Sequence, residues 1–339
     1  MLEVDNRTPF PAAPIPHQDP AGWDHLVVAI KGTLAISRDG ALHPADEQLP
    51  LCDADVHHGE PGESSVRYES DRCPQKPGTD VVLNGHAHAP HRRPVTQMDV
   101  ELRVGALRQL VRVMGDRSYH RSLGRWTISD PAPFAAMPLV YERAFGGVAL
   151  PQRDDEPIAC EERNPVGTGY APSRRGRDLE GVALPNLEDP TQLVQGPGDC
   201  PAPAGFGFIG RHWLPRRPLA GTYDERWRAE RAPLAPLDFD PRYHNGAHPR
   251  LISTPPLQGG ERVQVLGASA DGPLQLTLPE AHPAVSVWVS AVEQPQPTTL
   301  DTVIVEPDER RVLLTWRATM PISRKLLLVD RIRISGGPR

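Results

Sequence analysis

The stretch that most restricts how this chain can fold is the proline- and glycine-rich segment 203–236. Pro215 and Pro218 lack a backbone N–H group and have a fixed φ. The glycines at 205, 207 and 210 can adopt positive φ, which other residues rarely do. A helix or a central strand does not tolerate such residues at this spacing. The first half of the segment is therefore predicted to be an ordered but irregular ribbon.

The second half of the same segment is predicted to form one short helix. Thr222 and Glu225 have the spacing of a capping box, in which each side chain satisfies a free backbone donor of the first turn. Tyr223 and Trp227 are four residues apart and would share one helix face. Pro233 follows where the helix ends. We expect this aromatic face to dock onto a sheet.

The glycines of the ribbon also match the dinucleotide-binding pattern Gly-x-Gly-x-x-Gly, at positions 205, 207 and 210. That pattern binds a pyrophosphate only when a strand leads into it and a helix N-terminus follows. Here prolines precede the glycines and the sequence His-Trp-Leu-Pro-Arg-Arg-Pro follows them. The context disfavours nucleotide binding, and we expect no cofactor.

The sequence on either side of this segment has the pattern of antiparallel β-structure. Gln97 to Val104 alternates strictly between apolar and polar residues, as in a sheet that packs on one side only. Leu26 to Ile36 is rich in β-branched residues and precedes an Asp39-Gly40 turn. Similar short, turn-bounded strands resume after residue 251, for example Arg311 to Trp316.

These patterns predict a mainly β protein with two antiparallel lobes, each a β-sandwich or half-barrel. We place the N-terminal lobe at 1–145 and the C-terminal lobe at 251–339, joined by a motif-rich, irregular middle segment at 146–250 that packs across both. The chain has 339 residues, 40 of them Pro and 29 Gly. That share is high for an ordered protein but below the level typical of disorder.

Charge and hydropathy limit the classes of partner. The net charge of −6 disfavours nucleic acid and anionic membranes as partners. No apolar run is long enough to span a bilayer, and the first residues do not have the pattern of a signal peptide, so we expect a cytoplasmic protein without membrane insertion. The four cysteines are widely spaced, which favours reduced thiols.

Arginines cluster along the middle segment, and two interpretations of them remain open. They could form a solvated face, or they could form a basic rim around a protein-binding surface, because Arg, Trp and Tyr are enriched at interface anchors. The clusters comprise Arg174, Arg175 and Arg177, followed by Arg211, Arg216, Arg217, Arg226, Arg228 and Arg231.

The strongest metal candidates are His86, His88 and His91. In a strand the first two would point to the same side, but a zinc site needs further ligands that the sequence does not indicate. Ordinary strand or loop histidines are the alternative. The acidic runs Asp154-Asp155-Glu156 and Glu161-Glu162 lie in polar surroundings, where nothing would raise a carboxyl pKa, so we interpret them as solvated loops. No Gly-x-Ser-x-Gly motif is present.

Several further motifs carry a family resemblance that covers nearly the whole chain. They are Lys31-Gly32-Thr33, Gly85-His86-Ala87-His88-Ala89-Pro90, Tyr141-Glu142-Arg143-Ala144-Phe145-Gly146-Gly147, Asn164-Pro165-Val166-Gly167-Thr168-Gly169-Tyr170, Pro185-Asn186-Leu187-Glu188-Asp189-Pro190 and Leu237-Asp238-Phe239-Asp240-Pro241-Arg242. In this combination and order, the chain resembles an uncharacterised bacterial family encoded beside type VI secretion effectors. Members of that family are regarded as adaptors or chaperones that help to place an effector on the secretion spike.

The resemblance implies a non-enzymatic adaptor that binds a type VI secretion effector, through its PAAR-like or other N-terminal domain, before loading. The spike trimer is a further partner that it implies. The alternative is a metal-dependent hydrolase or carbohydrate-binding protein, and a third hypothesis is a permanent component of the secretion particle. Candidate partner-binding residues are Arg143, Phe145, Arg211, Trp213, Arg216, Arg217, Tyr223 and Trp227.

Two smaller expectations concern single motifs. Glu142 and Arg143 could belong to a partner-binding loop, or they could form a buried pair that closes the first lobe. Asn164, Asn186 and Asn245 are expected to cap helices or form turns, because asparagine side chains commonly bond to nearby backbone groups.

Overall fold

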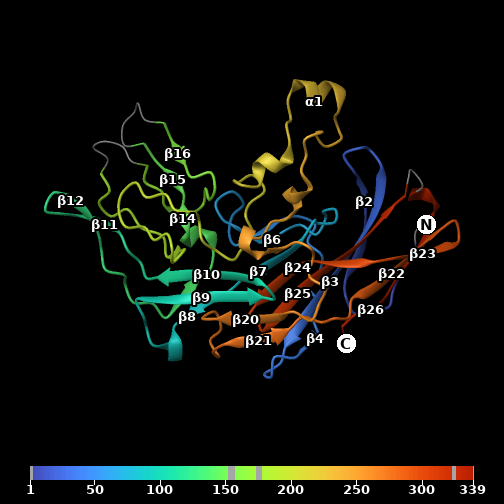
Figure 1. Ribbon diagram of the computed structural model, residues 1–339, viewed down its shortest axis with the longest axis horizontal. Coiled ribbons are helices and arrows are strands. Elements are labelled where there is room, and N and C mark those ends of the chain that lie inside the picture. The colour runs from blue at the N-terminus through green and yellow to red at the C-terminus, as the bar shows by residue number, and fades with distance from the viewer. Residues whose placement is uncertain (1–2, 152–156, 173–177, 323–325, 339) are drawn as a thin grey trace.

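The computed structural model describes residues 3–151, 157–172, 178–322 and 326–338, and its fold is built mainly from strands (Figure 1). This confirms the predicted fold class. Two of the sequence motifs fall outside the described residues, namely the arginine cluster Arg174, Arg175 and Arg177 and the acidic run Asp154-Asp155-Glu156.

The largest sheet has seven strands and is antiparallel except where β24 runs parallel to β7. Its strands, in spatial order, are β19 (Ile252–Ser253), β7 (Thr79–Leu83), β24 (Thr298–Glu306), β25 (Arg311–Pro321), β3 (Asp24–Ile36) and β2 (Ala12–Gln18), with β4 (Leu42–Pro44) also paired to β3. Most of β3 is buried along its length, because it lies between two neighbouring strands and both of its faces are covered.

A second sheet of five strands contains the alternating segment that the sequence singles out. Its order is β18 (Leu187–Glu188), β10 (Leu107–Met114), β9 (Gln97–Val104), β20 (Arg262–Leu266) and β21 (Leu274–Thr277). Strand β9 has the predicted bounds and forms a hairpin with β10, in which Val104 lies opposite Leu107. Val100, Leu102 and Val104 are fully buried, as the alternation predicts.

The third sheet has four strands, β1 (Glu3–Asn6), β26 (Val329–Gly336), β22 (Pro283–Val289) and β23 (Val292–Gln296). Five two-stranded pairs are β5 (Val56–His57) with β6 (Val66–Tyr68), β8 (His86–His88) with β13 (Ala136–Pro138), β11 (Tyr119–Ser122) with β12 (Arg125–Ile128), β14 (Phe145–Gly146) with β17 (Thr168–Gly169), and β15 (Val148–Ala149) with β16 (Ala159–Cys160). The helices are α1 (Glu225–Glu230) and the 3-10 turns η1 (Pro90–Arg92), η2 (Tyr141–Arg143), η3 (Arg217–Ala220), η4 (Pro241–His244), η5 (Pro249–Leu251) and η6 (Leu326–Leu328).

The two ends of the chain share their sheets, which the division into 1–145 and 251–339 does not anticipate. Strand β3 pairs with β25 over eleven residue positions, from His25 opposite Pro321 to Ala35 opposite Arg311. Strand β9 likewise pairs with β20. Hydrogen bonds between the N-terminal and C-terminal parts therefore hold both large sheets together, instead of each end building its own.

The middle segment is ordered and enters the main core. Phe206, Phe208 and Trp213 are each at most 2% exposed and belong to the same apolar cluster as the strands of the large sheets. The ribbon also bonds to the sheet through its backbone, since the N–H of Leu83 donates to the carbonyl of Phe206. The predicted irregular ribbon is therefore confirmed.

The glycines of this ribbon make room for aromatic rings. A Cβ at Gly205 would lie 2.9 Å from the ring of Tyr141, and a Cβ at Gly210 would lie 2.8 Å from the ring of Trp213. These two rings meet edge to face with centroids 5.9 Å apart. The Gly-x-Gly-x-x-Gly pattern thus serves aromatic packing in this fold.

After the ribbon the chain leaves the sheets and forms a projection that we call the arm, residues 217–240. In Figure 1 the arm carries α1 at its far end, away from the sheets. The predicted capping box is wrong, because α1 is capped by Asp224, whose carboxylate accepts from the backbone N–H of Trp227. Thr222 instead bonds to Asp238 on the part of the arm that returns to the sheets.

The predicted aromatic pair does form on the arm. Tyr223 and Trp227 have ring centroids 4.7 Å apart. The indole N–H of Trp227 donates to the carbonyl of Leu234, which ties α1 to the chain that returns from it. The pair therefore packs within the arm. The expectation that this face docks onto a sheet is wrong.

These positions predict different consequences for the two tryptophans. Trp213→Ala removes a ring from the main core and is expected to lower the free energy of unfolding by about 3–5 kcal/mol. Trp227→Ala disrupts only the arm and is expected to leave the cooperative unfolding of the sheets intact. Urea denaturation followed by circular dichroism measures both. Equal losses in the two variants would contradict this assignment.

Candidate functional site

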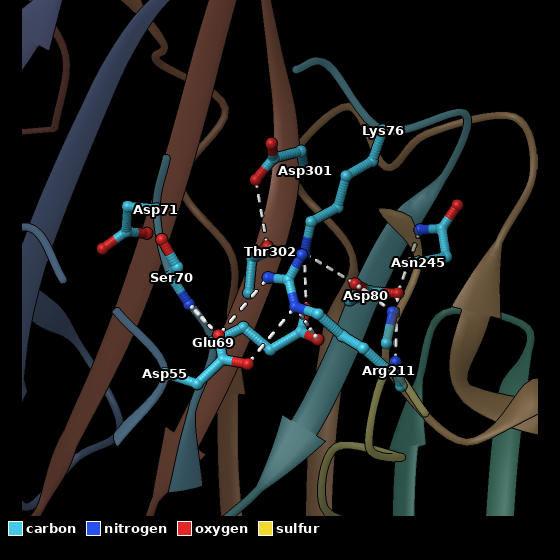
Figure 2. Close-up of polar contacts among 12 residues, drawn as sticks. Asp55, Glu69, Ser70, Asp71, Lys76, Asp80, Arg211, Asn245, Asp301 and Thr302 are labelled. Atoms are coloured by element: carbon cyan, nitrogen blue, oxygen red, sulfur yellow. Dashed lines mark hydrogen bonds and ion pairs between the residues drawn. The ribbon is translucent and has the colours of Figure 1, made fainter. Parts of the chain in front are cut away.

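A network of buried charges joins the middle segment to the sheets. Lys76 lies at its centre, and its ammonium contacts the Asp80 carboxylate at 2.7 Å and the Thr302 hydroxyl at 2.9 Å. Asp80 also accepts from the side chain of Asn245 and from the backbone of Gly246. Figure 2 shows these side chains converging from β7, β24 and the middle segment. A buried carboxylate with this many donors is fully satisfied.

Glu69 links the arginines of the middle segment to the same network. Its carboxylate lies 2.5 Å from Arg216 and 3.8 Å from Lys76. Arg216 also donates to the carbonyls of Ile209 and Tyr243, on either side of the arm. Because one buried guanidinium binds both ends of the arm, it fixes the direction in which the arm leaves the sheets.

Two further ion pairs extend the network across the large sheet. Lys31 on β3 lies 3.0 Å from Asp71, and Arg317 on β25 pairs with Asp301 on β24. The guanidinium of Arg317 also donates to the backbone carbonyl of Asp71. The network therefore connects the N-terminal strands, the C-terminal strands and the middle segment.

The electrostatic environment at the centre of the network favours the charged form of Lys76. Burial alone lowers the pKa of Lys76, but the negative charges of Asp80, Asp301 and Glu69 outweigh burial and raise that pKa above its ordinary value. The space left between these side chains is a cavity of about 10 Å³, lined by Lys31, Lys76 and Arg317 among others. That is room for about one water molecule. The arrangement thus braces the fold and has no space for a substrate.

Four of the predicted partner-binding residues lie wholly or largely inside the protein. Trp213, Arg216 and Phe145 are at most 3% exposed. Arg211 is half-buried and pairs with Asp55 at 3.2 Å. These side chains hold the middle segment in place, and their contact with a partner stays a prediction that their burial does not favour.

The other four lie at the surface. Arg143 is half-exposed and contacts Asp116 at 3.3 Å, while Glu142 bonds separately to Ser65, so the proposed Glu-Arg pair does not form. Arg217 begins the arm and lies 3.2 Å from Glu162. Tyr223 is 56% exposed on the arm, beside the half-buried Trp227.

The arm is not the basic rim that the arginine content suggests. Arg226 pairs with Glu230, and Arg228 pairs with Glu225, within α1 itself. Its surface is therefore mixed in charge, with exposed apolar side chains between the ion pairs. Leu237 is the most exposed of these, with 84% of its surface exposed.

A shallow groove of about 330 Å³ runs along the arm. Its apolar lining comes from Trp227, Pro236 and Leu237, and its polar lining includes Arg226 and Asp238. Next to the arm lies the loop between β2 and β3, where Pro20 accepts a hydrogen bond from Arg231 of the arm. The arm and this loop therefore support each other at the surface.

The three candidate metal ligands do not converge. His86 and His88 both bond to the carboxylate of Asp308, at 2.9 Å and 2.6 Å, whereas His91 lies exposed in η1. In the residues that the structure describes, no group of three or more His, Cys, Asp or Glu side chains is placed to hold a metal ion. This geometry gives the metal-dependent alternative no support.

The acidic partners of the network are not among the residues that the sequence motifs indicate. Asp80 lies within the buried strand β7, Asp301 within β24 and Arg317 within β25. A single charge inside a buried strand is the signal that could have identified them, because such a charge requires a partner.

The side chains of Asn164, Asn186 and Asn245 have a wider structural role than the sequence predicts. Asn164 donates to the carbonyls of Tyr141 and Phe145, and Asn186 donates to the carbonyl of Met114. Asn245 donates to Asp80 in the network. As expected, Asn245 is the C-cap residue of η4 and Asn164 begins a turn that the N–H of Gly167 closes. In addition, all three side chains connect segments that are distant in the chain.

One family model matches most of the chain. A sequence model of an uncharacterized protein conserved in bacteria, DUF2169, matches residues 21–317. The matched region includes the whole arm and the whole buried network from Lys31 to Arg317. No curated protein and no solved structure matches the chain. None of the helices in the described ranges has the length and apolar character needed to cross a bilayer.

The network predicts a large cost for removing its central cation. Lys76→Met leaves Asp80 and Glu69 buried without that charge, and we expect the free energy of unfolding to fall by about 3–5 kcal/mol at neutral pH. Arg226→Ala, which breaks an exposed ion pair on α1, is the matched control and should leave the denaturation midpoint unchanged. A Lys76→Met variant as stable as this control would contradict a bracing role.

The buried His244 at the base of the arm predicts that the stability of the protein depends on pH. Burial, reinforced by the positive charge of Arg211, lowers the pKa of His244 from 6.5 to about 3. The unfolded chain takes up a proton near pH 6.5 while the folded chain does not, so stability is lost as the pH falls from 6.5 towards 3. His244→Gln should flatten the stability curve in this window by at most about 1.4 kcal/mol per pH unit. Parallel curves for both proteins would refute this assignment.

Proposed function

This chain belongs to the DUF2169 family of bacterial proteins, and from that premise we propose that it is a cytoplasmic adaptor or chaperone for a type VI secretion effector. It would bind the effector at its PAAR-like or other N-terminal domain and hold it until loading onto the spike, with the spike trimer as a further partner. Its action would consist of binding, without a catalytic step.

The observation that carries this proposal is the arm. An adaptor needs a surface that stays in place before its client arrives, because binding energy is lost when loops must be ordered first. The arm meets this need through Arg216, which binds Ile209 and Tyr243 at the two ends of the projection. Long surface loops on a rigid scaffold commonly carry binding functions.

The exposed composition of the arm fits a protein client. Tyr223 and Leu237 are 56% and 84% exposed, and Trp23 on the neighbouring loop is 56% exposed. Tyrosine, tryptophan and arginine are typical of the residues that dominate binding energy at interfaces. The groove between Trp227 and Leu237 would receive an apolar side chain of the client.

The two sheet edges formed by β2 and β23 are a weaker place for the client. An extended peptide can add a strand to an open edge through backbone hydrogen bonds. The outer strand β2 contains Pro14 and Pro16, and the outer strand β23 contains Pro295. Because proline has no N–H to donate, these edges are protected against strand addition. Side chains of the arm are therefore the preferred contact.

Substitutions on the arm test this function. Tyr223→Ser and Leu237→Ser should each weaken binding of the effector encoded beside this protein by about 1–2 kcal/mol, as measured by calorimetry, without changing the melting temperature. Val292→Ser removes a similarly exposed side chain from the distant β22–β23 turn and should bind normally. Equal affinity in all variants would exclude the arm as the binding surface.

The adaptor role itself is tested by co-expression. With this protein present, the effector should be more soluble, more abundant and better secreted than without it. An effector that is equally soluble, abundant and secreted in its absence would end the chaperone proposal. Recovery of the protein with sheared or secreted spikes would instead indicate a permanent component of the particle.

A further inference from the structure

A second projection, the β11–β12 hairpin, has an unusual residue at its tip. Leu123 and Gly124 form its two-residue turn and both have positive φ, 47° and 79°. Such turns favour Asn-Gly, because a bulky side chain is strained at positive φ. Leu123 is also fully exposed to solvent. The fold gains nothing from a leucine here, and strained residues of this kind point to a function.

The base of the hairpin is firmly attached. Tyr119 is 3% exposed and belongs to a second apolar cluster with Phe145 and Leu184. The backbone N–H of Arg121 donates to Glu180 at 3.0 Å, and the carbonyl of Tyr119 accepts from Gly181. The tip is thus presented in a fixed orientation at one end of the molecule (Figure 1).

The charges at the tip differ from those on the arm. Arg121 and Arg125 flank the turn, and neither guanidinium is paired with a carboxylate of the described residues. Arg121 instead lies over the ring of Trp126, its cross-strand neighbour, at 5.9 Å from the ring centroid. The tip therefore presents one apolar side chain between two positive charges that no carboxylate of the described residues pairs with.

From this arrangement we propose that the hairpin tip is a second docking element, which inserts Leu123 into an apolar socket rimmed by carboxylates on a protein partner. The identity of that partner as the effector rests on the proposed function. A protein socket suits this tip better than an anionic membrane, because one leucine and two arginines bury too little apolar surface to anchor a chain whose net charge is −6.

The turn geometry supplies a substitution that separates folding from binding. Leu123→Asn places the favoured residue at this turn position, so the melting temperature should stay equal or rise. The same change removes the side chain that enters the socket, and affinity for the co-expressed effector should fall at least tenfold. Ser290→Asn alters the matching position of the β22–β23 turn, where φ is 50°, and should leave affinity unchanged.

The charges are tested by salt dependence. The double variant Arg121→Gln and Arg125→Gln should associate with the effector more slowly and with a weaker dependence on ionic strength than the unaltered protein. An unchanged dependence would show that these arginines do not face carboxylates.

The outcomes separate the two proposals. If the unaltered protein does not bind the effector, both proposals fall. If it binds and Leu123→Asn binds equally well, only the docking role of the hairpin falls. Binding of the unaltered protein to phosphatidylserine vesicles that is lost in Leu123→Asn would assign the tip to a membrane and would also overturn this inference.

Discussion

The ion pairs of Lys76 with Asp80 and of Arg216 with Glu69 are the interactions on which the rest of this structure depends. Arg216 and Glu69 come from separate regions of the chain. Lys76 and Asp80 are four residues apart, but Lys76 also bonds to Thr302 and Asp80 to Asn245, so this pair too connects distant segments. Removing one partner of a buried pair leaves a charge in a medium that cannot solvate it. For that reason the sheets and the middle segment adopt their positions together, and the arm has a single direction of exit.

This bracing explains how a chain so rich in proline and glycine can present an ordered surface. The ribbon contributes Phe206 and Phe208 to the core, while the charges fix its ends. The polar interactions here act mainly on specificity, because apolar burial would stabilise the ribbon in several registers whereas a paired charge accepts only one. We regard that selectivity as the property that an adaptor requires from its scaffold.

The strands could be predicted from the sequence, but their partners could not. The alternation in Gln97–Val104 and the turns after β3 and β20 follow from local rules. Periodicity says nothing about which strand lies alongside, so the pairing of β3 with β25 across the whole chain was inaccessible. A shared sheet and two separate lobes have the same local pattern.

The candidate site divides in the same way. Composition drew attention to Tyr223 and Trp227 of the arm, because aromatic residues and arginines are enriched at interfaces. Composition could not distinguish Arg216 from Arg217. These residues are adjacent in the chain, but the side chain of Arg216 is buried and that of Arg217 is exposed. That difference is set by Glu69, a residue far away in sequence, and only the folded arrangement reveals it.

The central claim is that a charge-braced arm grips a protein client. Hydrogen–deuterium exchange of the purified protein, alone and with the effector bound, tests it most directly. The account predicts that binding protects the backbone amides of residues 217–240, while the amides around Lys76 exchange slowly in both states. Protection confined to the sheet edges, with the arm unchanged, would contradict it.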